Sequence, residues 1–325
     1  IDETGITGMS QPPLPLVENE KVVGRVKQDE QQAIVETHTK AAVKFIQSNR
    51  ENPFFLYLPH TAVHFPIYPG KAWAGKSPHG FYSDWVEEVD ASVGQVLDTL
   101  RELQLDTRTL VIFTSDNGGT PRGVNAPLRG HKGSTWEGGM RVPTIAWWPG
   151  RIPAGTSSDE VTGMLDVLPT LVAIAGGTLP ADRKLDGMNI WPILAGEPGA
   201  EGHDVFYYYR GLRLMAIRSG PWKLHLPGAN PPAVSSKAAK KKGLSAGPQL
   251  YNLVGDIGES QNVAAANGDI VKRLQALADA MNDDLGTDGK GPGVRPLGRV
   301  ENPKPLIHKD GSVRADAVGE KQRFD

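Results

Sequence analysis

The chain alternates short apolar segments with longer amphipathic ones, and this order constrains the fold more than any other feature. Apolar segments of strand length, each ending at Pro or Gly, occupy residues 53–59, 110–119 and 144–150. Apolar residues recur at helical spacing in residues 28–46, 84–103 and 165–176, and Gly176 is suited to end the last helix. This alternation predicts an α/β fold with a mostly parallel sheet flanked by helices.

The pattern changes near residue 200. Short alternating segments split by Gly and Pro predict an antiparallel sheet, and an amphipathic helix is expected around residues 270–285. The chain is therefore predicted to comprise an α/β domain (1–200), a small C-terminal α+β subdomain (201–285) and an extended polar tail (286–325). The first 28 residues lack periodicity and are predicted to form a loop.

Composition excludes several kinds of site. The chain has 325 residues, a formal net charge of -2 and no cysteine. This charge gives no reason to expect a nucleic-acid partner. Without cysteine, these residues supply no disulfide, thiolate metal ligand or cysteine nucleophile. No apolar run approaches the roughly 20 residues that cross a bilayer, so we expect no membrane span.

Asp116 and Asn117 directly follow the second apolar segment. In open parallel sheets, ligands bind at the carboxyl ends of the strands. A carboxylate and an amide carbonyl are hard oxygen donors, which suit Ca²⁺, with Mg²⁺ as an alternative, better than zinc. The competing interpretation is an Asx turn before the two glycines. A calcium site has about six or more oxygens, so these two donors would supply only part of it and the rest must come from elsewhere.

Histidines and cations fill two other loops. His60 and His64 follow the first apolar segment. A loop imidazole can bind an anion or protonate a leaving group, although packing or surface roles are the ordinary alternative. A Gly-rich stretch before the third segment gathers four cationic or imidazole side chains: Arg129, His131, Lys132 and Arg141. Lysine offers a compact charge to a tetrahedral anion, and a solvated basic loop is the alternative. Together these residues predict a hard metal beside cations, which suits a sulfate or phosphate ester.

Six ordered blocks resemble the formylglycine-dependent sulfatases of the alkaline phosphatase superfamily: PFFLYLPHTAVHFP, TLVIFTSDNGG, PLRGHKGSTWEGGMRVP, LDVLPTLVAIAG, AIRSGPWKL and LYNLVGDIGESQNVA. The resemblance covers about residues 30–285 and is closest to arylsulfatase-like and N-acetylgalactosamine-6-sulfatase-like members. It implies a calcium-dependent sulfuric ester hydrolase that acts on an aryl or carbohydrate sulfate, with the small C-terminal subdomain of that family.

The resemblance also assigns roles to single residues. Asp116 and Asn117 match one pair of calcium ligands. Lys132 matches the lysine that contacts the sulfate and helps to stabilise the leaving oxygen. His64 matches the histidine that binds sulfate and protonates the leaving group, whereas His60 has no counterpart and is expected either to be structural or to support the residues that bind the substrate.

The family's nucleophile lies in a Cys- or Ser-x-Pro-x-Arg motif, which these residues do not contain. In the family's order, that motif, two further Asp ligands of calcium and a Lys-x-His element precede residue 1. We therefore expect an N-terminally truncated fragment that has no sulfatase activity by itself and binds calcium weakly. The resemblance further implies a periplasmic or extracellular compartment.

Two other functions fit the same residues. A phosphodiesterase or phosphonate hydrolase of the same superfamily would use similar metal chemistry, and turnover of a phosphate diester would identify it. A non-catalytic protein could instead bind sulfated glycans through Lys132, Arg129 and His64, and retained glycan affinity at physiological salt would identify it.

Overall fold

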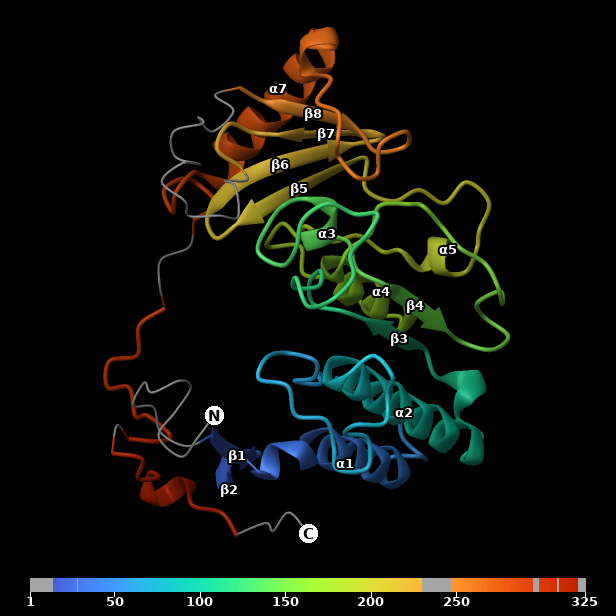
Figure 1. Ribbon diagram of the computed structural model, residues 1–325, viewed down its shortest axis with the longest axis vertical. Helices are drawn as coiled ribbons and strands as arrows, with labels where there is room; N and C mark the ends of the chain where they lie inside the picture. The colour runs from blue at the N-terminus through green and yellow to red at the C-terminus, as the bar shows by residue number, and fades with distance from the viewer. Residues whose placement is uncertain (1–13, 28, 230–246, 295–297, 309, 321–325) are drawn as a thin grey trace. The chain divides into compact units, whose positions relative to one another are not determined.

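The computed structural model describes residues 14–27, 29–229, 247–294, 298–308 and 310–320 (Figure 1). The chain forms two compact units, one made of Ile1–Thr109 with Gly298–Asp325 and the other of Leu110–Leu297. These two units, which are defined by contacts between residues, do not coincide with the predicted α/β domain, C-terminal subdomain and tail. That division of the chain stays a prediction.

Two helices lie side by side in the first unit, accompanied by two 3-10 turns: η2 (Asp29–Ala33), α1 (Ile34–Ser48), α2 (Phe81–Glu102) and η3 (Asp106–Arg108). Apolar residues at helical spacing bury one face of α1, namely Val35, Ala42 and Ile46. Between the helices, the hydroxyls of Thr39 and Ser92 share a hydrogen bond of 2.6 Å. Both helices are confirmed where the apolar spacing predicts them.

A β-hairpin replaces the predicted loop over residues 14–26, while residues 1–13 of that prediction lie outside the described residues. Its strands are β1 (Leu14–Glu18) and β2 (Lys21–Val26), paired antiparallel. Asn19, in the two-residue turn, has a φ of 54°, which asparagine tolerates in hairpin turns. The chain returns to this hairpin near its other end, where Val318 bridges Val22 in parallel. The turn asparagine between two apolar runs was the signal for this hairpin.

Residues 53–59 do not form the buried strand that is predicted for them. Phe55 and Tyr57 are 70% and 69% exposed, while Phe54 packs edge-on against Phe45 at 5.9 Å between ring centroids. Alternating exposure is the pattern of an extended chain. A strand also needs a neighbour to exchange backbone hydrogen bonds, and no described strand pairs with this segment.

The other two predicted strands are confirmed as β3 (Val111–Thr114) and β4 (Thr144–Trp147), but they pair antiparallel, with Thr114 opposite Thr144. A parallel pair needs a crossover that carries the chain back to the start of the first strand. Residues 115–143 instead form a loop with one short helix, α3 (Glu137–Met140), and re-enter beside the end of β3. The alternation of elements alone does not reveal this return.

The predicted C-terminal sheet and helix are confirmed in the second unit (Figure 1). Four antiparallel strands follow one another in the order β5 (Val205–Arg210), β6 (Arg213–Ser219), β7 (Trp222–His225) and β8 (Gln249–Asn252). Helix α7 (Gly268–Leu285) packs on one face around a core of Leu214, Ile217, Leu224, Leu250, Leu274 and Ala278. Because side chains alternate along a strand, Lys223 and His225 project from the opposite face of β7 to Leu224.

The remaining elements are short and complete the two units: η4 (Met164–Asp166), α4 (Val167–Ile174), α5 (Trp191–Leu194), η5 (Ala264–Ala266) and η6 (Ala315–Ala317). The helix predicted to end at Gly176 is confirmed as α4, and Gly176 has the left-handed φ of 71° expected after a helix C-terminus. No helix in the described part of the chain is long and apolar enough to cross a membrane.

Candidate active site

His64 lies exposed in the loop between residues 60 and 80 of the first unit. Its Nδ1 is 2.7 Å from the carbonyl oxygen of Phe65. Because a carbonyl only accepts, Nδ1 carries a hydrogen, and Nε2 is the ring atom left to bind or release a proton. This arrangement suits a proton donor toward a leaving group.

His60 is partly buried and differs from His64 in its contacts. Its Nε2 lies 3.0 Å from the Ser92 hydroxyl, and its ring centroid lies 6.4 Å from that of His38. Burial lowers the pKa of His60, and the nearby His38 lowers it further. A neutral imidazole packed against α2 supports the structural role expected for His60.

Two carboxylates of α2 hold the loop between residues 60 and 80. Asp84 is buried and accepts three consecutive backbone N–H groups, the last being that of Ser77 at 2.6 Å. Glu88 accepts the Gly70 N–H at 2.7 Å. The hydrogen bond from Ser77 is the main cause of a lowered pKa of Asp84, whereas burial raises the pKa of Glu88. The loop is therefore fixed to α2 through its main chain.

Asp116 and Asn117 lie directly after β3, and the Asp116 side chain is exposed. The glycines that follow them pack against a second pair of glycines. The Gly118 N–H donates to the Gly139 carbonyl at 3.1 Å, and a Cβ on Gly118 would lie 2.0 Å from the Gly138 oxygen. Only glycine permits this approach of two backbones, a requirement that spacing in the sequence does not show.

Lys132 is exposed in a closed loop of residues 129–138, named here the Lys132 loop. The Gly138 N–H donates to the Arg129 carbonyl at 2.7 Å and closes the neck of this loop. The Lys132 N–H donates to the Gly119 carbonyl at 3.0 Å. The Lys132 loop is therefore docked on the segment that carries Asp116 and Asn117.

The structure thus places three of the predicted site residues, Asp116, Asn117 and Lys132, on two adjoining loops of one unit. His64 belongs to the other unit, so its convergence on the same pocket stays a prediction. The roles of all four side chains are likewise predictions.

Other cations of the Gly-rich stretch have different surroundings. The Arg129 guanidinium lies 3.9 Å from the centroid of the Trp136 ring and donates to the Glu259 carbonyl at 2.7 Å. These contacts hold Arg129 in the fold and disfavour it as a glycan ligand. His131 is exposed, and its Nδ1 lies 3.0 Å from the side-chain nitrogen of Asn125.

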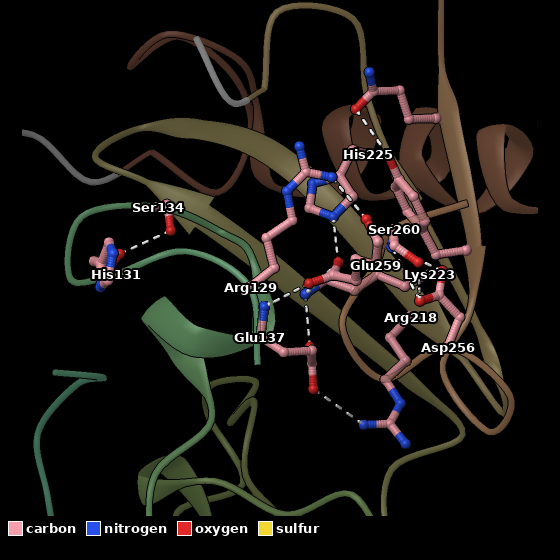
Figure 2. A network of polar contacts seen from close by, with 12 residues as sticks. Arg129, His131, Ser134, Glu137, Arg218, Lys223, His225, Asp256, Glu259 and Ser260 are labelled. Carbon is pink, nitrogen blue, oxygen red and sulfur yellow. Dashed lines mark hydrogen bonds and ion pairs between the residues drawn. The ribbon is translucent and has the colours of Figure 1, made fainter. Parts of the chain in front are cut away.

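A buried network of charged residues, which the sequence analysis missed, joins the Lys132 loop to β7 (Figure 2). It consists of Glu137, Lys223, His225 and Glu259, each at most 2% exposed. Lys223 Nζ lies 2.6 Å from Glu137 Oε1 and 3.3 Å from Glu259 Oε1. His225 Nε2 lies 2.7 Å from the same Glu259 oxygen. The signal in the sequence was the alternation of Lys223 and His225 with apolar residues in a predicted strand.

The charges of this buried network balance one another. Burial would raise the pKa of Glu259, but the hydrogen bond from His225 and the charge of Lys223 outweigh it and lower that pKa. Burial lowers the pKa of His225 although its hydrogen bond to Glu259 opposes this. Arg218 adds a second cation, 3.9 Å from Glu137 Oε2. At neutral pH, two carboxylates therefore face two cations and a neutral imidazole that donates from Nε2.

Asp116 and Asn117 offer the oxygen chemistry that a hard cation requires. Within the described residues, no group of three or more His, Cys, Asp or Glu side chains is arranged to hold a metal ion. Because Ca²⁺ takes about six to eight oxygens, these two side chains fit part of a calcium site and not all of it.

Comparisons with known proteins agree with the order of the sequence blocks. Residues 8–177 match the Sulfatase family, and residues 201–290 match the C-terminal region of aryl-sulfatase. The chain is 41% identical to steryl-sulfatase of Homo sapiens over 211 residues, which cover 59% of this chain and 36% of that protein. It is 33% identical to N-acetylgalactosamine-6-sulfatase of Canis lupus familiaris over 300 residues, which cover 82% of this chain and 57% of that protein.

A solved structure, Ps i-CgsB in complex with k-i-k-neocarrahexaose, has a TM-score of 0.68 and 29% sequence identity, covering 82% of this chain and 57% of that chain. This likeness confirms the predicted α/β fold class. The chain spans 36% and 57% of the lengths of the two curated relatives.

Proposed function

The chain belongs to the sulfatase family, and from this we propose that residues 1–325 carry part of the active site of a sulfuric ester hydrolase. One observation carries the proposal. The hydrogen bond of 3.0 Å from the Lys132 N–H to the Gly119 carbonyl docks a cationic loop beside a pair of hard oxygen donors. A tetrahedral dianion needs positive charge, which Lys132 would supply directly and the oxygen donors would supply through the Ca²⁺ that they hold.

In this proposal, Lys132 binds the sulfuryl oxygens. Its side chain is exposed on a loop whose neck is closed by hydrogen bonds, so the backbone that carries the ammonium is fixed before substrate binds. A cation presented in this way stabilises charge that builds on the sulfuryl oxygens in the transition state. Asp116 and Asn117 would hold Ca²⁺, which supplies further positive charge to the same oxygens when bound.

His64 has the role of proton donor in this proposal. The hydrogen bond from Nδ1 to the Phe65 carbonyl orients the ring and leaves Nε2 to transfer a proton. A proton donated from Nε2 to the departing oxygen would release a neutral alcohol, which leaves more easily than an alkoxide.

For the substrate, we infer a sulfate ester of a carbohydrate or an aryl alcohol. The similarity to an N-acetylgalactosamine-6-sulfatase and to a structure that contains a neocarrahexaose supports a carbohydrate. We also infer a periplasmic or extracellular compartment, because the resemblance to sulfatases implies one.

The test is the effect of Lys132→Ala in an active protein that contains residues 1–325. We expect kcat/KM for an aryl sulfate to fall by about 100-fold to 1,000-fold, the usual loss when one group that stabilises an oxyanion is removed. Lys184→Ala is the matched control, because Lys184 is an exposed lysine of the same unit paired with Asp284. The proposal would be contradicted if both variants were equally active. It would also be contradicted if the unchanged protein turned over an aryl phosphate diester faster than the aryl sulfate.

A further inference from the structure

One buried residue, Glu259, contacts both ends of the Lys132 loop (Figure 2). At the start of the loop, the Arg129 guanidinium donates to the Glu259 carbonyl oxygen at 2.7 Å. At its end, the Glu137 N–H donates to Oε2 of Glu259 at 2.7 Å. Lys132 lies between these two contacts in the sequence. Glu259 therefore fixes both ends of the loop that carries Lys132.

Glu259 is in turn fixed by the C-terminal sheet. Its second carboxylate oxygen, Oε1, accepts a hydrogen bond from His225 Nε2 at 2.7 Å and lies 3.3 Å from Lys223 Nζ. Both partners come from β7, and Leu224 between them packs in the core on the other face. Glu259 is 0% exposed. Charged hydrogen bonds in such a water-excluded place are stronger than at a surface, so the link between sheet and loop is stiff.

The backbone of Glu259 supports a special role for its side chain. Its φ is 51°, in the left-handed region that a residue with a Cβ avoids. Glycine would adopt this conformation without strain, and glutamate persists only because its surroundings hold it. A carboxylate kept at a position that favours glycine indicates that the carboxylate itself is needed there.

We propose that Glu259 is a positioning residue for Lys132, an inference that rests on the proposed function of Lys132 in binding sulfate. Glu259 does not touch the substrate. It holds residues 129 and 137 at a fixed separation and so keeps the Lys132 ammonium where the sulfuryl oxygens bind. The β5–β8 sheet thereby takes part in building the site.

Two substitutions at one position separate the carboxylate from the backbone. Glu259→Gly removes the carboxylate and relieves the left-handed strain, whereas Glu259→Gln keeps the shape and one accepting oxygen. Leu250→Ala is the control for general loss of stability, because Leu250 is fully buried in the same sheet on the α7 face. Amide hydrogen exchange of the 325-residue chain is measured at Lys132 and Gly138 and compared with that of β6 and β7.

In Glu259→Gly, we expect exchange in the Lys132 loop to accelerate by about tenfold or more relative to the sheet, the effect of losing a charged hydrogen bond. Glu259→Gln should show a smaller increase. Leu250→Ala should accelerate loop and sheet together and leave their ratio unchanged. The inference is overturned if Glu259→Gly leaves this ratio unchanged or alters it no more than Leu250→Ala does.

A second readout follows the Lys132 ammonium directly. With calcium present, inorganic sulfate should slow acylation of Lys132 in the unchanged chain and in Glu259→Gln, and should slow it less in Glu259→Gly. Equal protection in Glu259→Gly would overturn the positioning role. If sulfate gives no protection in the unchanged chain, the proposed function fails, whereas the exchange ratio still decides whether Glu259 positions the loop.

Discussion

The two loops proposed to face the sulfate are both held by buried carboxylates, but the partners of these carboxylates differ. In the loop of His64, Asp84 and Glu88 accept main-chain N–H groups. In the Lys132 loop, Glu137 pairs with the side chain of Lys223, and Glu259, which accepts the Glu137 N–H from outside the loop, also binds the side chains of Lys223 and His225.

This difference indicates which substitutions would destabilise each loop. A carboxylate that binds main-chain N–H groups tolerates changes in the side chains of the loop, because the backbone remains. In the buried network, removal of one side chain leaves a charge buried without its partner, which is costly. We therefore expect the Lys132 loop to be more sensitive to single substitutions than the loop of His64.

The largest effect is expected for Lys223→Met. Glu137 and Glu259 would remain buried without the ammonium between them, and the free energy of unfolding should fall by about 3–5 kcal/mol. Urea denaturation measures it. Adding Glu137→Gln should restore part of the loss, because it removes one of the two buried carboxylates that lose the ammonium. A loss below about 1 kcal/mol, as for an exposed ion pair, would remove the contrast between the two loops.

A smaller effect is expected for Asp84→Asn. The amide keeps one accepting oxygen for the loop, so the unfolding midpoint should move less than in Lys223→Met, while proteolysis within residues 70–80 becomes severalfold faster. Asp90→Asn is the control, since Asp90 is an exposed carboxylate of the same helix. If both variants are cleaved at the same rate, Asp84 does not hold the loop.

The pH dependence of stability should also separate the two kinds of anchor. Burial lowers the pKa of His225, so the unfolded chain binds protons more readily, and stability falls as the pH drops below about 6.5. The pKa of Asp84 is lowered by hydrogen bonding, so its contribution is complete above the ordinary aspartate value and is lost as the pH falls from that value through the lower folded value.

Urea unfolding at pH 7 and pH 5 tests this expectation with His225→Gln. The partly buried His38 and His60 of the first unit should still contribute to the loss at pH 5, because burial lowers their pKa values as well. The loss in stability between the two pH values should therefore be reduced in the variant but not abolished. An unchanged difference would show that His225 does not titrate in this range.

The smallest effect is expected for Lys184→Ala. The side chains of Lys184 and Asp284 are 82% and 55% exposed, although they lie 2.7 Å apart. Such a pair contributes about 0.2–1 kcal/mol, and the free energy of unfolding should change by no more than this. A loss as large as that of Lys223→Met would mean that burial does not explain the sensitivity of the Lys132 loop.

Local pattern was enough to predict the helices and the loops that carry the candidate residues. The apolar spacing of α1 and α2 and the polar residues after β3 are visible within short windows of sequence. The resemblance then singled out Lys132 and His64, which composition alone could not distinguish from surface residues.

Contacts between distant residues could not be predicted in this way. Glu137 meets Lys223 of β7 and Glu259, which follows β8, only when these distant segments pack against the Lys132 loop. The antiparallel pairing of β3 with β4 depends on the path of a long loop, and the left-handed φ of Glu259 depends on its buried partners. These features are set by tertiary packing and leave little trace in local periodicity.

The central claim is that Asn117 and Lys132 face one binding site for a tetrahedral anion. The most direct test is a titration of the isotope-labelled chain with inorganic sulfate in the presence of calcium, followed by NMR at the amides of these two residues. We predict that the two signals shift together with a single midpoint. Unchanged signals at Lys132, or different midpoints for Asn117 and Lys132, would contradict a shared site.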